Sequence, residues 1–366
     1  MKLGPVAFCM SLVSFARGFR SMAVRAARPL LATQCAMSTA TTAEATNAFL
    51  QQEDLPKFGA VQSEELTPAV ETLLEKLQTD FAQLETKLAQ TNGAVEYDMV
   101  VPAVEKMQFP LGFAWGIASH LNGVKNSDAL REQYEANQPK IVQAMSQFKQ
   151  SKPLYDALKV VAEKLEQAGD DSFEAMQKKR AVEISLREMM LGGVGLEGAA
   201  KERFNEIKMR LAALATTFSN NVLDETKAFS LTIDDASKMK GVPDSAKAMW
   251  ANAHVMHLQM SGATDVPEMD PNAGPWRITG DMPSYIAVMS HMRDREIREH
   301  CYRSKIQVAS ETNPDKNNVP LIYEILALKQ EMAKMLGFEN YAELSLASKM
   351  APSVQGKDCC GLRKVS

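Results

Sequence analysis

Residues 196–224 read LEGAAKERFNEIKMRLAALATTFSNNVLD, and this stretch decides the fold class. Large apolar side chains recur along it at every third or fourth position, namely Phe204, Ile207, Leu211, Leu214, Phe218 and Val222. Lysine, arginine and glutamate fill many of the positions between them. Such spacing gathers the apolar side chains on one face of an α-helix. At a rise of about 1.5 Å per residue this helix is on the order of 40 Å long, so we predict that it crosses a whole domain.

The same periodicity covers most of the chain on either side of this helix. It predicts further helices over residues 67–91, 127–150, 153–167, 173–191, 284–310 and 319–336. Thr67 is expected to cap the first of them, because Pro68 suits the first position of a helix. Glycine and proline predict turns at Gly192-Gly193, Gly241-Val242-Pro243, Asn313-Pro314 and Gly337. The body of the protein is therefore predicted to be helical.

One segment, residues 229–280, departs from the helical periodicity. Residues 229–233 and 257–260 alternate apolar and polar side chains as strands do, and prolines and glycines crowd together in residues 267–275. We therefore predict a short β-hairpin inserted into an all-α fold. No internal repeat of fixed period is present, which disfavours a regular solenoid.

The composition is that of a soluble globular protein, with 45% hydrophobic and 23% charged residues among 366. No run approaches 18 consecutive apolar residues, so we expect no membrane-spanning helix and no membrane partner. Residues 1–43 hold five of the 41 basic residues and none of the 45 acidic ones. The remaining chain is therefore acidic, which argues against a nucleic-acid partner. The five cysteines have neither disulfide nor metal-ligand spacing, which fits a reducing compartment.

The first 43 residues are predicted to be a targeting segment. They are rich in arginine, serine, threonine and alanine, with apolar side chains at helical spacing, namely Leu12, Phe15, Phe19 and Met22. An acid-free amphipathic leader of this kind is typical of transit peptides and predicts the mitochondrial matrix, the plastid stroma, or both. A secretory signal is the alternative, with Lys2 before a weak apolar core over residues 3–15. A restart of translation at Met37 would instead give a cytosolic form.

Motifs for catalysis are missing from the sequence. Zinc peptidases place two histidines one helical turn apart in H-E-x-x-H, where the glutamate activates the metal-bound water. His254 and His257 come nearest, but they are three residues apart and Val255 stands where the glutamate would be. His291 and His300 are predicted to lie on opposite faces of one helix.

The remaining candidates have plainer interpretations. Residues 192–195, GGVG, lack the lysine and hydroxyl residue of a phosphate-binding loop and predict a turn between helices. Cys301 is expected to be a buried core thiol, and the 22 methionines are expected to fill the core. We therefore assign no catalytic, cofactor-binding or metal-binding residue.

Four strings nevertheless resemble one family. They are SHLNGVKNS at residues 119–127, FSNNVLD at 218–224, LGFENYA at 336–342 and SKMA at 348–351. In order and content they resemble the oligopeptidase A branch of the thimet oligopeptidase family of zinc metallopeptidases, which includes plant organellar oligopeptidases. The resemblance extends from about Leu55 to Ser353. It implies an almost entirely helical fold with two lobes flanking a channel, short peptides as partners, zinc as the cofactor of the complete enzyme, and a role in clearing cleaved transit peptides.

The family's zinc-binding helix and transition-state-stabilising residues lie C-terminal to the region that matches. We therefore expect residues 44–353 to be the helical N-terminal region of an oligopeptidase A-like metallopeptidase and residues 354–366 to be a divergent tail. The chain alone is expected to bind no zinc and to be inactive, which leaves its status as an enzyme open. The alternative is a helical peptide-binding or assembly module that acts without catalysis.

Overall fold

The computed structural model describes residues 47–351, apart from 53–54 and 92–93, together with residues 353–354. The predicted targeting segment lies outside the described residues, and so does nearly all of the predicted tail. Both therefore stay predictions.

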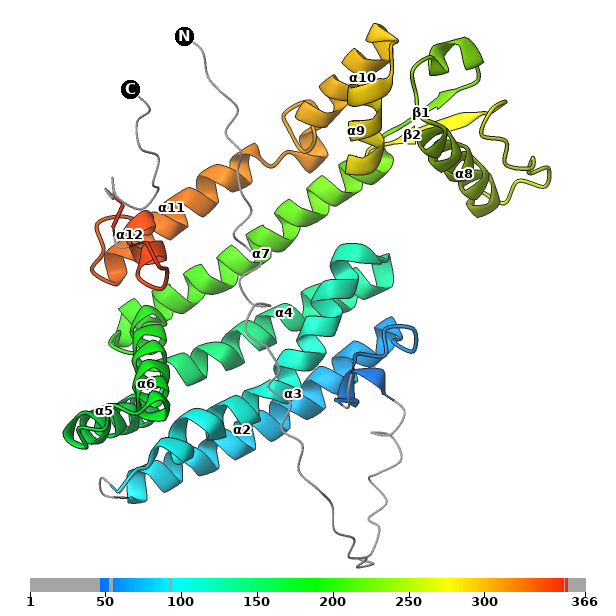
Figure 1. Cartoon of the computed structure of the whole chain (residues 1–366). Helices are drawn as coiled ribbons and strands as arrows, with labels where there is room; N and C mark the ends of the chain where they lie inside the picture. Colours follow the sequence, from blue (N-terminus) through cyan, green and yellow to red (C-terminus); the bar gives the residue numbers. More distant parts are fainter. Residues whose placement is uncertain (1–46, 53–54, 92–93, 352, 355–366) are drawn as a thin grey trace, which may run out of the picture. The chain divides into compact units, whose positions relative to one another are not determined.

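Helices dominate the described residues, and the only β-structure among them is a two-stranded antiparallel sheet (Figure 1). The predicted fold class is thereby confirmed. The chain divides into two compact units, which we call the first unit, Met1–Ala213 with Lys329–Ser366, and the second unit, Leu214–Leu328. Each has helices of its own.

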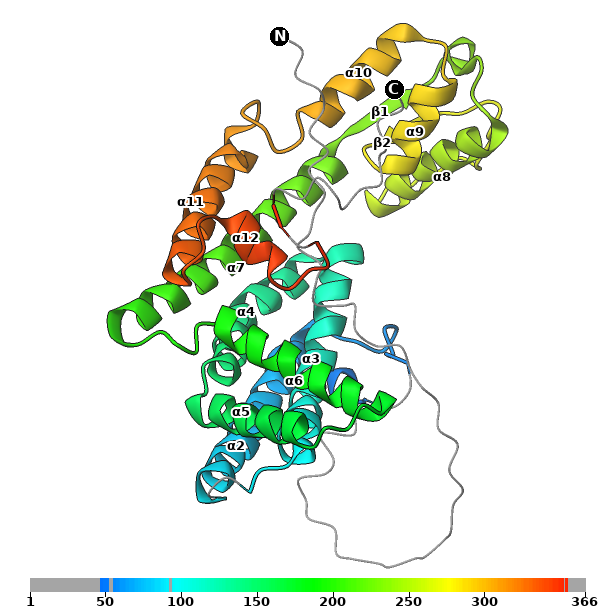
Figure 2. The ribbon, with the colours of Figure 1, turned by 60° about the vertical axis from the view of Figure 1, so that its left-hand side comes forward.

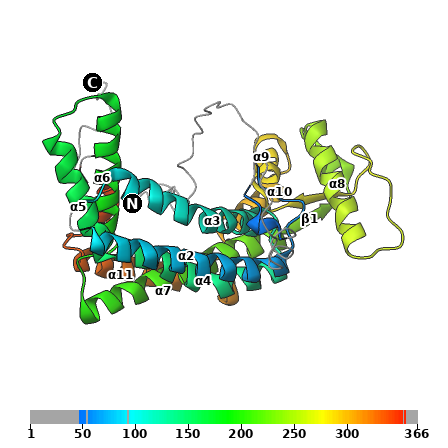
Figure 3. The same cartoon turned by 90° about the horizontal axis from the view of Figure 1, so that it is seen from below.

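The first unit is built on a bundle of helices. In chain order these are α2 Leu66–Gln90, α3 Tyr97–Val124, α4 Asp128–Lys149, α5 Lys152–Gln167 and α6 Phe173–Leu191, preceded by the 3₁₀ turns η1 Ala48–Leu50 and η2 Ser63–Glu65. Helix α2 contacts α3, α4 and α5, and α5 packs along α6. Figure 3 shows α3 and α4 beside α2.

Apolar stripes at helical spacing hold this bundle together. The stripe of α2 is buried, and its members are Leu66, Val70, Leu73, Leu77, Phe81, Leu84 and Leu88. Phe81 stacks on Phe148 of α4 with ring centroids 3.9 Å apart. On α3, Trp115 stacks on Tyr134 of α4 with centroids 4.3 Å apart. Ser127, Ser151 and Ser172 cap α4, α5 and α6, since each hydroxyl accepts a hydrogen bond from a backbone N–H three residues later.

The cap predicted at Thr67 is wrong. Helix α2 begins at Leu66, directly after η2, so Thr67 already lies in its first turn. The Thr67 hydroxyl donates to Gln133 Oε1 and accepts from Asn137 Nδ2 at 2.6 Å, both on α4. The Thr67 side chain therefore links α2 to α4 instead of capping the start of α2.

Helix α3 has no counterpart among the predicted helices. Pro102 and Pro110 lie inside it, and proline normally interrupts a helix because it lacks an N–H and its ring crowds the preceding turn. Here the bundle contacts of α3 outweigh that local preference.

Two long helices include residues of both units. Helix α7, Gly198–Ala228, confirms the helix predicted over residues 196–224, and α11 spans Val319–Met335. Within the first unit, Arg203 of α7 donates to both carboxylate oxygens of Glu331 on α11, at 2.7 and 2.9 Å. The short helix α12, Tyr341–Leu346, follows.

The second unit surrounds the small sheet. Strand β1, Ser230–Ile233, pairs with β2, Trp276–Thr279, so that Ser230 lies opposite Thr279. Between the strands run the 3₁₀ turn η3 Ala236–Met239 and helix α8 Asp244–Met260, and after them come α9 Met282–His291, α10 Arg295–Ile306 and the 3₁₀ turn η4 Pro314–Lys316. Helices α8 and α9 pack against β2 (Figure 2). Trp250 and Trp276 are fully buried in this core, and the Trp250 indole N–H donates to Ser284 Oγ at 3.1 Å.

Two predictions for this unit need correction. The strand predicted over residues 257–260 is the last turn of α8, and the true partner of β1 lies at residues 276–279. Four residues are too few to separate strand alternation from helical periodicity. The helix predicted over residues 284–310 is two helices, because Met292 is extended and Asp294 caps α10 by accepting from Ile297 N–H at 3.0 Å.

Along the described part of the chain, every helix is either too short or too polar to cross a membrane.

Candidate functional site

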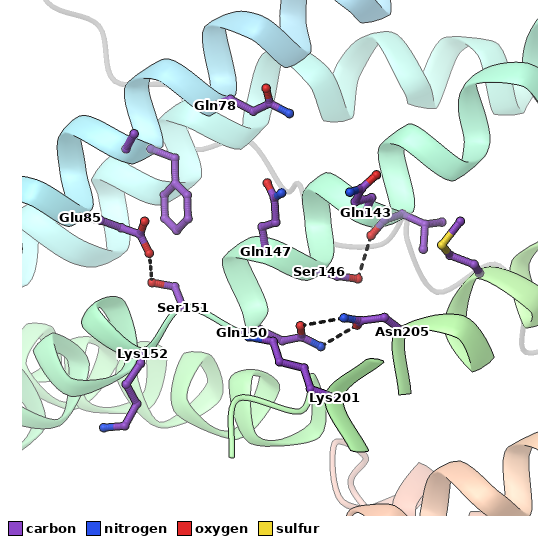
Figure 4. Close-up of a pocket in the computed structure, with 14 residues that line it drawn as sticks. Gln78, Glu85, Gln143, Ser146, Gln147, Gln150, Ser151, Lys152, Lys201 and Asn205 are labelled. Carbon is purple, nitrogen blue, oxygen red and sulfur yellow. Dashed lines mark hydrogen bonds between the residues drawn. The ribbon is translucent and has the colours of Figure 1, made fainter. Parts of the chain in front are cut away.

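A pocket of about 950 Å³ opens on the first unit, where residues of α2, α4, α5 and α7 meet (Figure 4). Amide side chains dominate its polar lining, namely Gln78, Gln143, Gln147, Gln150 and Asn205. Glu85, Ser146, Ser151, Lys152 and Lys201 add charges and hydroxyls. We call this hollow the amide pocket.

Helical spacing explains how the sequence builds the amide pocket. Gln143 and Gln147 lie one turn apart on the same face of α4, and Gln150, the C-cap of this helix, follows three residues later. On α2, Gln78 and Glu85 are seven residues apart, two turns along the same face. Both polar faces border the stripe that Phe81 and Phe148 bury, so packing of the core brings them together.

The floor of the pocket is a pair of amides. Gln150 Nε2 donates to Asn205 Oδ1 at 2.8 Å, and Asn205 Nδ2 donates back to Gln150 Oε1 at 3.2 Å. Gln150 Nε2 also donates to the carbonyl of Gly192 at 3.1 Å. All polar atoms of the buried Gln150 side chain are therefore satisfied, which fixes α4 against the start of α7.

The predicted turn at residues 192–195 is confirmed, and a steric reason explains why its first residue is a glycine. It connects α6 to α7. A Cβ atom on Gly192 would lie 2.6 Å from the Cβ of Lys149, closer than real side chains approach. Only a glycine lets this backbone reach α4 and offer its carbonyl to Gln150.

Two further residues shape the electrostatics. Ser151 Oγ donates to Glu85 Oε1, which holds that carboxylate at the α2 side of the pocket. Lys208 of α7 donates from Nζ to Ser146 Oγ at 2.6 Å, and Ser146 in turn donates to the carbonyl of Val142 at 2.7 Å. Burial, with a smaller contribution from the charge of Lys149, lowers the pKa of Lys208 to about 8.

This lining is suited to binding. A side-chain amide carries one acceptor oxygen and two N–H donors, which are the groups that a peptide backbone also presents. Gln78, Gln143 and Gln147 are exposed, and their side-chain amides make no hydrogen bond to another described residue. Figure 4 shows Gln78 and Gln147 bordering the hollow from different helices. An extended chain lying there would meet amides from two helices.

The histidines singled out in the sequence lie elsewhere. His254 and His257 are on α8 in the second unit, and His254 Nδ1 is buried without a hydrogen-bond partner. The placement of His291 and His300 on one helix is wrong, because they belong to α9 and α10. Among the residues that the structure describes, no group of three or more His, Cys, Asp and Glu side chains is arranged to hold a metal ion.

Cys301 is buried, as predicted, in the core of the second unit. Burial raises the pKa of its thiol to about 11, so the nucleophilic thiolate is scarce at neutral pH. A structural role fits this environment.

The sequence did contain a signal for the amide pocket. Glutamines at positions 143, 147 and 150 form a polar stripe with few charges, which is unusual for a solvated helix face. These glutamines come close to Gln78 and Asn205 only through contacts between helices that are distant in sequence. The spacing of residues along one helix does not predict such contacts.

Comparisons with known proteins agree with the architecture. Residues 70–201 match the family described as "Neurolysin/Thimet oligopeptidase, N-terminal domain", and residues 288–357 match "Peptidase family M3". Most of the amide pocket lies within the first match.

Three relatives show how far the likeness extends. The chain is 36% identical over 306 residues to a probable cytosolic oligopeptidase A of Arabidopsis thaliana, covering 84% of this chain and 41% of the relative. It is also 36% identical over 306 residues to the organellar oligopeptidase A, chloroplastic/mitochondrial, of the same plant, covering 84% and 36%. Oligopeptidase A of Escherichia coli is 34% identical over 315 residues, covering 85% and 43%. The chain thus spans less than half the length of these relatives.

Proposed function

Because the chain belongs to the thimet oligopeptidase and oligopeptidase A family of peptidases, we propose that it is the helical, channel-forming N-terminal part of an organellar zinc oligopeptidase. The complete protein would degrade short peptides, including cleaved transit peptides. An acid-free, arginine-containing leader and the organellar relative from A. thaliana support the placement in mitochondria or plastids.

The amide pocket is the observation that carries this proposal. It lies mostly in the part of the chain that matches the N-terminal domain of the family. Its exposed glutamines are neutral and can both donate and accept hydrogen bonds, so they suit the backbone of an extended peptide whatever its sequence. A folded protein satisfies its own backbone groups and would offer few to such a surface.

Zinc does not fit the described residues of this chain. The pair His254 and His257 has no third donor grouped with it, and Val255 lies between them where a general base would stand. We therefore derive no hydrolytic step here, and we propose for this chain the binding of peptides alone.

The second candidate is a peptide-binding or assembly module that acts without catalysis. The same two observations favour it, namely the amide pocket and the lack of a metal-donor group in the described part of the chain. Both candidates predict peptide binding, and they differ in whether a catalytic partner region exists.

Peptide binding is tested by fluorescence anisotropy with the 366-residue chain and a short, unstructured, labelled peptide. We expect Gln143→Leu combined with Gln147→Leu to weaken binding about tenfold, because two amides each lose hydrogen bonds to the peptide backbone. A peptide of the same sequence with N-methylated backbone amides should bind the unchanged protein as weakly as the unmodified peptide binds the double variant. If no unstructured peptide binds to the chain, the proposal is refuted.

The matched control is Gln83→Leu. Gln83 is an exposed amide on α2, the same helix as Gln78, but it does not line the amide pocket. This variant should keep the affinity of the unchanged chain. A loss equal to that of the pocket variant would mean that binding does not depend on the pocket.

The two candidates are separated by co-expression with the remainder of oligopeptidase A from E. coli, beyond its matched 43%. Cleavage of a reporter peptide by the reconstituted pair favours the oligopeptidase part. Peptide binding without any reconstituted cleavage favours the module.

A further inference from the structure

Lys208 is a cation without a counter-charge at the edge of the amide pocket. Its ammonium group has three N–H donors, one of which serves Ser146, a residue of the pocket lining. The ring of Phe204 lies on another side, with its centroid 5.7 Å from Nζ. Lys208 is half-buried and makes no ion pair with any described residue, whereas charges withdrawn from water in proteins are normally paired.

Four acidic side chains of the surrounding helices are already engaged with other partners. Glu188 of α6 pairs with Lys149 at 3.4 Å, and Glu206 of α7 pairs with Arg203 at 3.2 Å. Glu85 of α2 accepts from Ser151, and Asp156 of α5 pairs with Lys152. Lys149 adds a second positive charge close to Lys208 and lowers its pKa further.

A second cation lies on the same face of α7. Lys201, Asn205 and Lys208 are spaced by four and three residues, so they form one stripe along the helix. Lys201 and Asn205 line the amide pocket, and Lys201 makes no ion pair with a described residue. Figure 4 shows Lys201 and Asn205 near Gln150. The α7 wall of the pocket therefore has Lys201 in its lining, with Lys208 bound to the lining residue Ser146, and no acidic side chain of α7 belongs to that lining.

We propose that this wall is an anion subsite in which Lys208 and Lys201 bind a carboxylate group of a peptide whose backbone lies along the glutamines. The inference rests on the proposed function and specifies which peptides the pocket prefers. The carboxylate belongs to the C-terminus of the peptide or to an aspartate or glutamate side chain, and both sources present the same group. Binding supplies the missing counter-charge and occupies the free donors of Lys208.

The test compares three labelled peptides of one neutral sequence, using the 366-residue chain and fluorescence anisotropy. The first has a free C-terminal carboxylate, the second a C-terminal amide, and the third a C-terminal amide with one internal glutamate. We expect the first, the third or both to bind about tenfold more tightly than the neutral peptide, as for one charge-assisted hydrogen bond. Preference for the first identifies the C-terminus, and preference for the third identifies an acidic side chain.

Lys208→Met should abolish this preference, so that the three peptides bind the variant with equal affinity, whatever the change does to the affinity for the neutral peptide. Lys76→Met is the matched control, because it also removes one positive charge, but Lys76 is exposed on α2 and does not line the pocket. A second measurement needs no variant: in the unchanged protein, NMR of labelled lysine should show the pKa of Lys208 rising from about 8 when the carboxylate peptide binds, since a nearby anion favours the charged form.

Equal affinity for all three peptides, or an unchanged pKa of Lys208 in the bound state, would overturn the anion subsite alone. No binding by any of the three would overturn the proposed function together with the subsite.

Discussion

Removing the amide of Asn205 should destabilise the protein more than its position near the surface suggests. Asn205 is half-buried, but its partner Gln150 is buried and uses Asn205 both as acceptor, at 2.8 Å, and as donor, at 3.2 Å. In Asn205→Ala, Gln150 Nε2 keeps its bond to the carbonyl of Gly192, while Gln150 Oε1 loses its only partner. One hydrogen bond is thus lost and one buried acceptor is left unsatisfied.

An unsatisfied buried polar group costs about 1–3 kcal/mol, so we expect the free energy of unfolding to fall by about that amount. Urea denaturation followed by circular dichroism measures the change. Gln83→Ala, which removes an exposed amide from α2, should stay within about 0.5 kcal/mol of the unchanged chain.

A double-mutant cycle sharpens the test. Asn205→Leu combined with Gln150→Leu removes both amides, so the pair should cost less than the sum of the single changes by about 1 kcal/mol. If Asn205→Ala costs no more than Gln83→Ala, or if the cycle is additive, the amide pair does not fix α4 to α7 in the way described.

Three further outcomes follow from the same structure. Gly192→Ala should lower the free energy of unfolding by about 1–3 kcal/mol in denaturation, because its Cβ would lie 2.6 Å from that of Lys149; a neutral effect would show that the turn relaxes freely. Folding lowers the pKa of Lys208 from its ordinary value of 10.5 to about 8, so between these pH values the unfolded state binds more protons and stability from this group increases with pH. Lys208→Met should therefore stabilise the chain by about 1–3 kcal/mol at pH 7 and flatten the stability profile between pH 8 and 10.5, and a variant that is less stable at pH 7 would contradict this. Iodoacetamide at pH 8 should alkylate Cys301 only after denaturation, as judged by peptide mass spectrometry, because the native thiol is buried with a pKa of about 11.

The helices with a regular apolar stripe were predictable from sequence, and the exceptions have identifiable causes. Helix α7 was predicted within a few residues at each end, because its charged and apolar positions alternate with helical spacing. Helix α3 was missed because Pro102 and Pro110 oppose helix formation locally, and packing of the bundle overrides them. The break at Met292 was missed because Asp294 continues a helical charge pattern, although it serves as an N-cap.

The amide pocket was beyond sequence reasoning for a different reason. Each of its walls follows a recognisable spacing, yet Gln78, Gln150 and Asn205 meet only because α2 packs on α4 and hydrogen bonds join the end of α4 to α7. The unpaired state of Lys208 is likewise a property of the packed structure, since Glu206, two residues away in sequence, pairs with Arg203 instead. Sequence identified what each helix face carries, while the fold determined which faces share a pocket.

The three tryptophans are distributed so that the chain contains its own optical reporters. Trp115 stacks on Tyr134 in the first unit, whereas Trp250 and Trp276 are fully buried in the second. Indole emission shifts to longer wavelength when water reaches the ring, so Trp115→Phe leaves a protein whose fluorescence follows only the second unit. Conversely, replacing both Trp250 and Trp276 by phenylalanine leaves a protein whose fluorescence follows only the first unit. Melting curves of the two variants would show whether the first and second units unfold in one cooperative event or in succession.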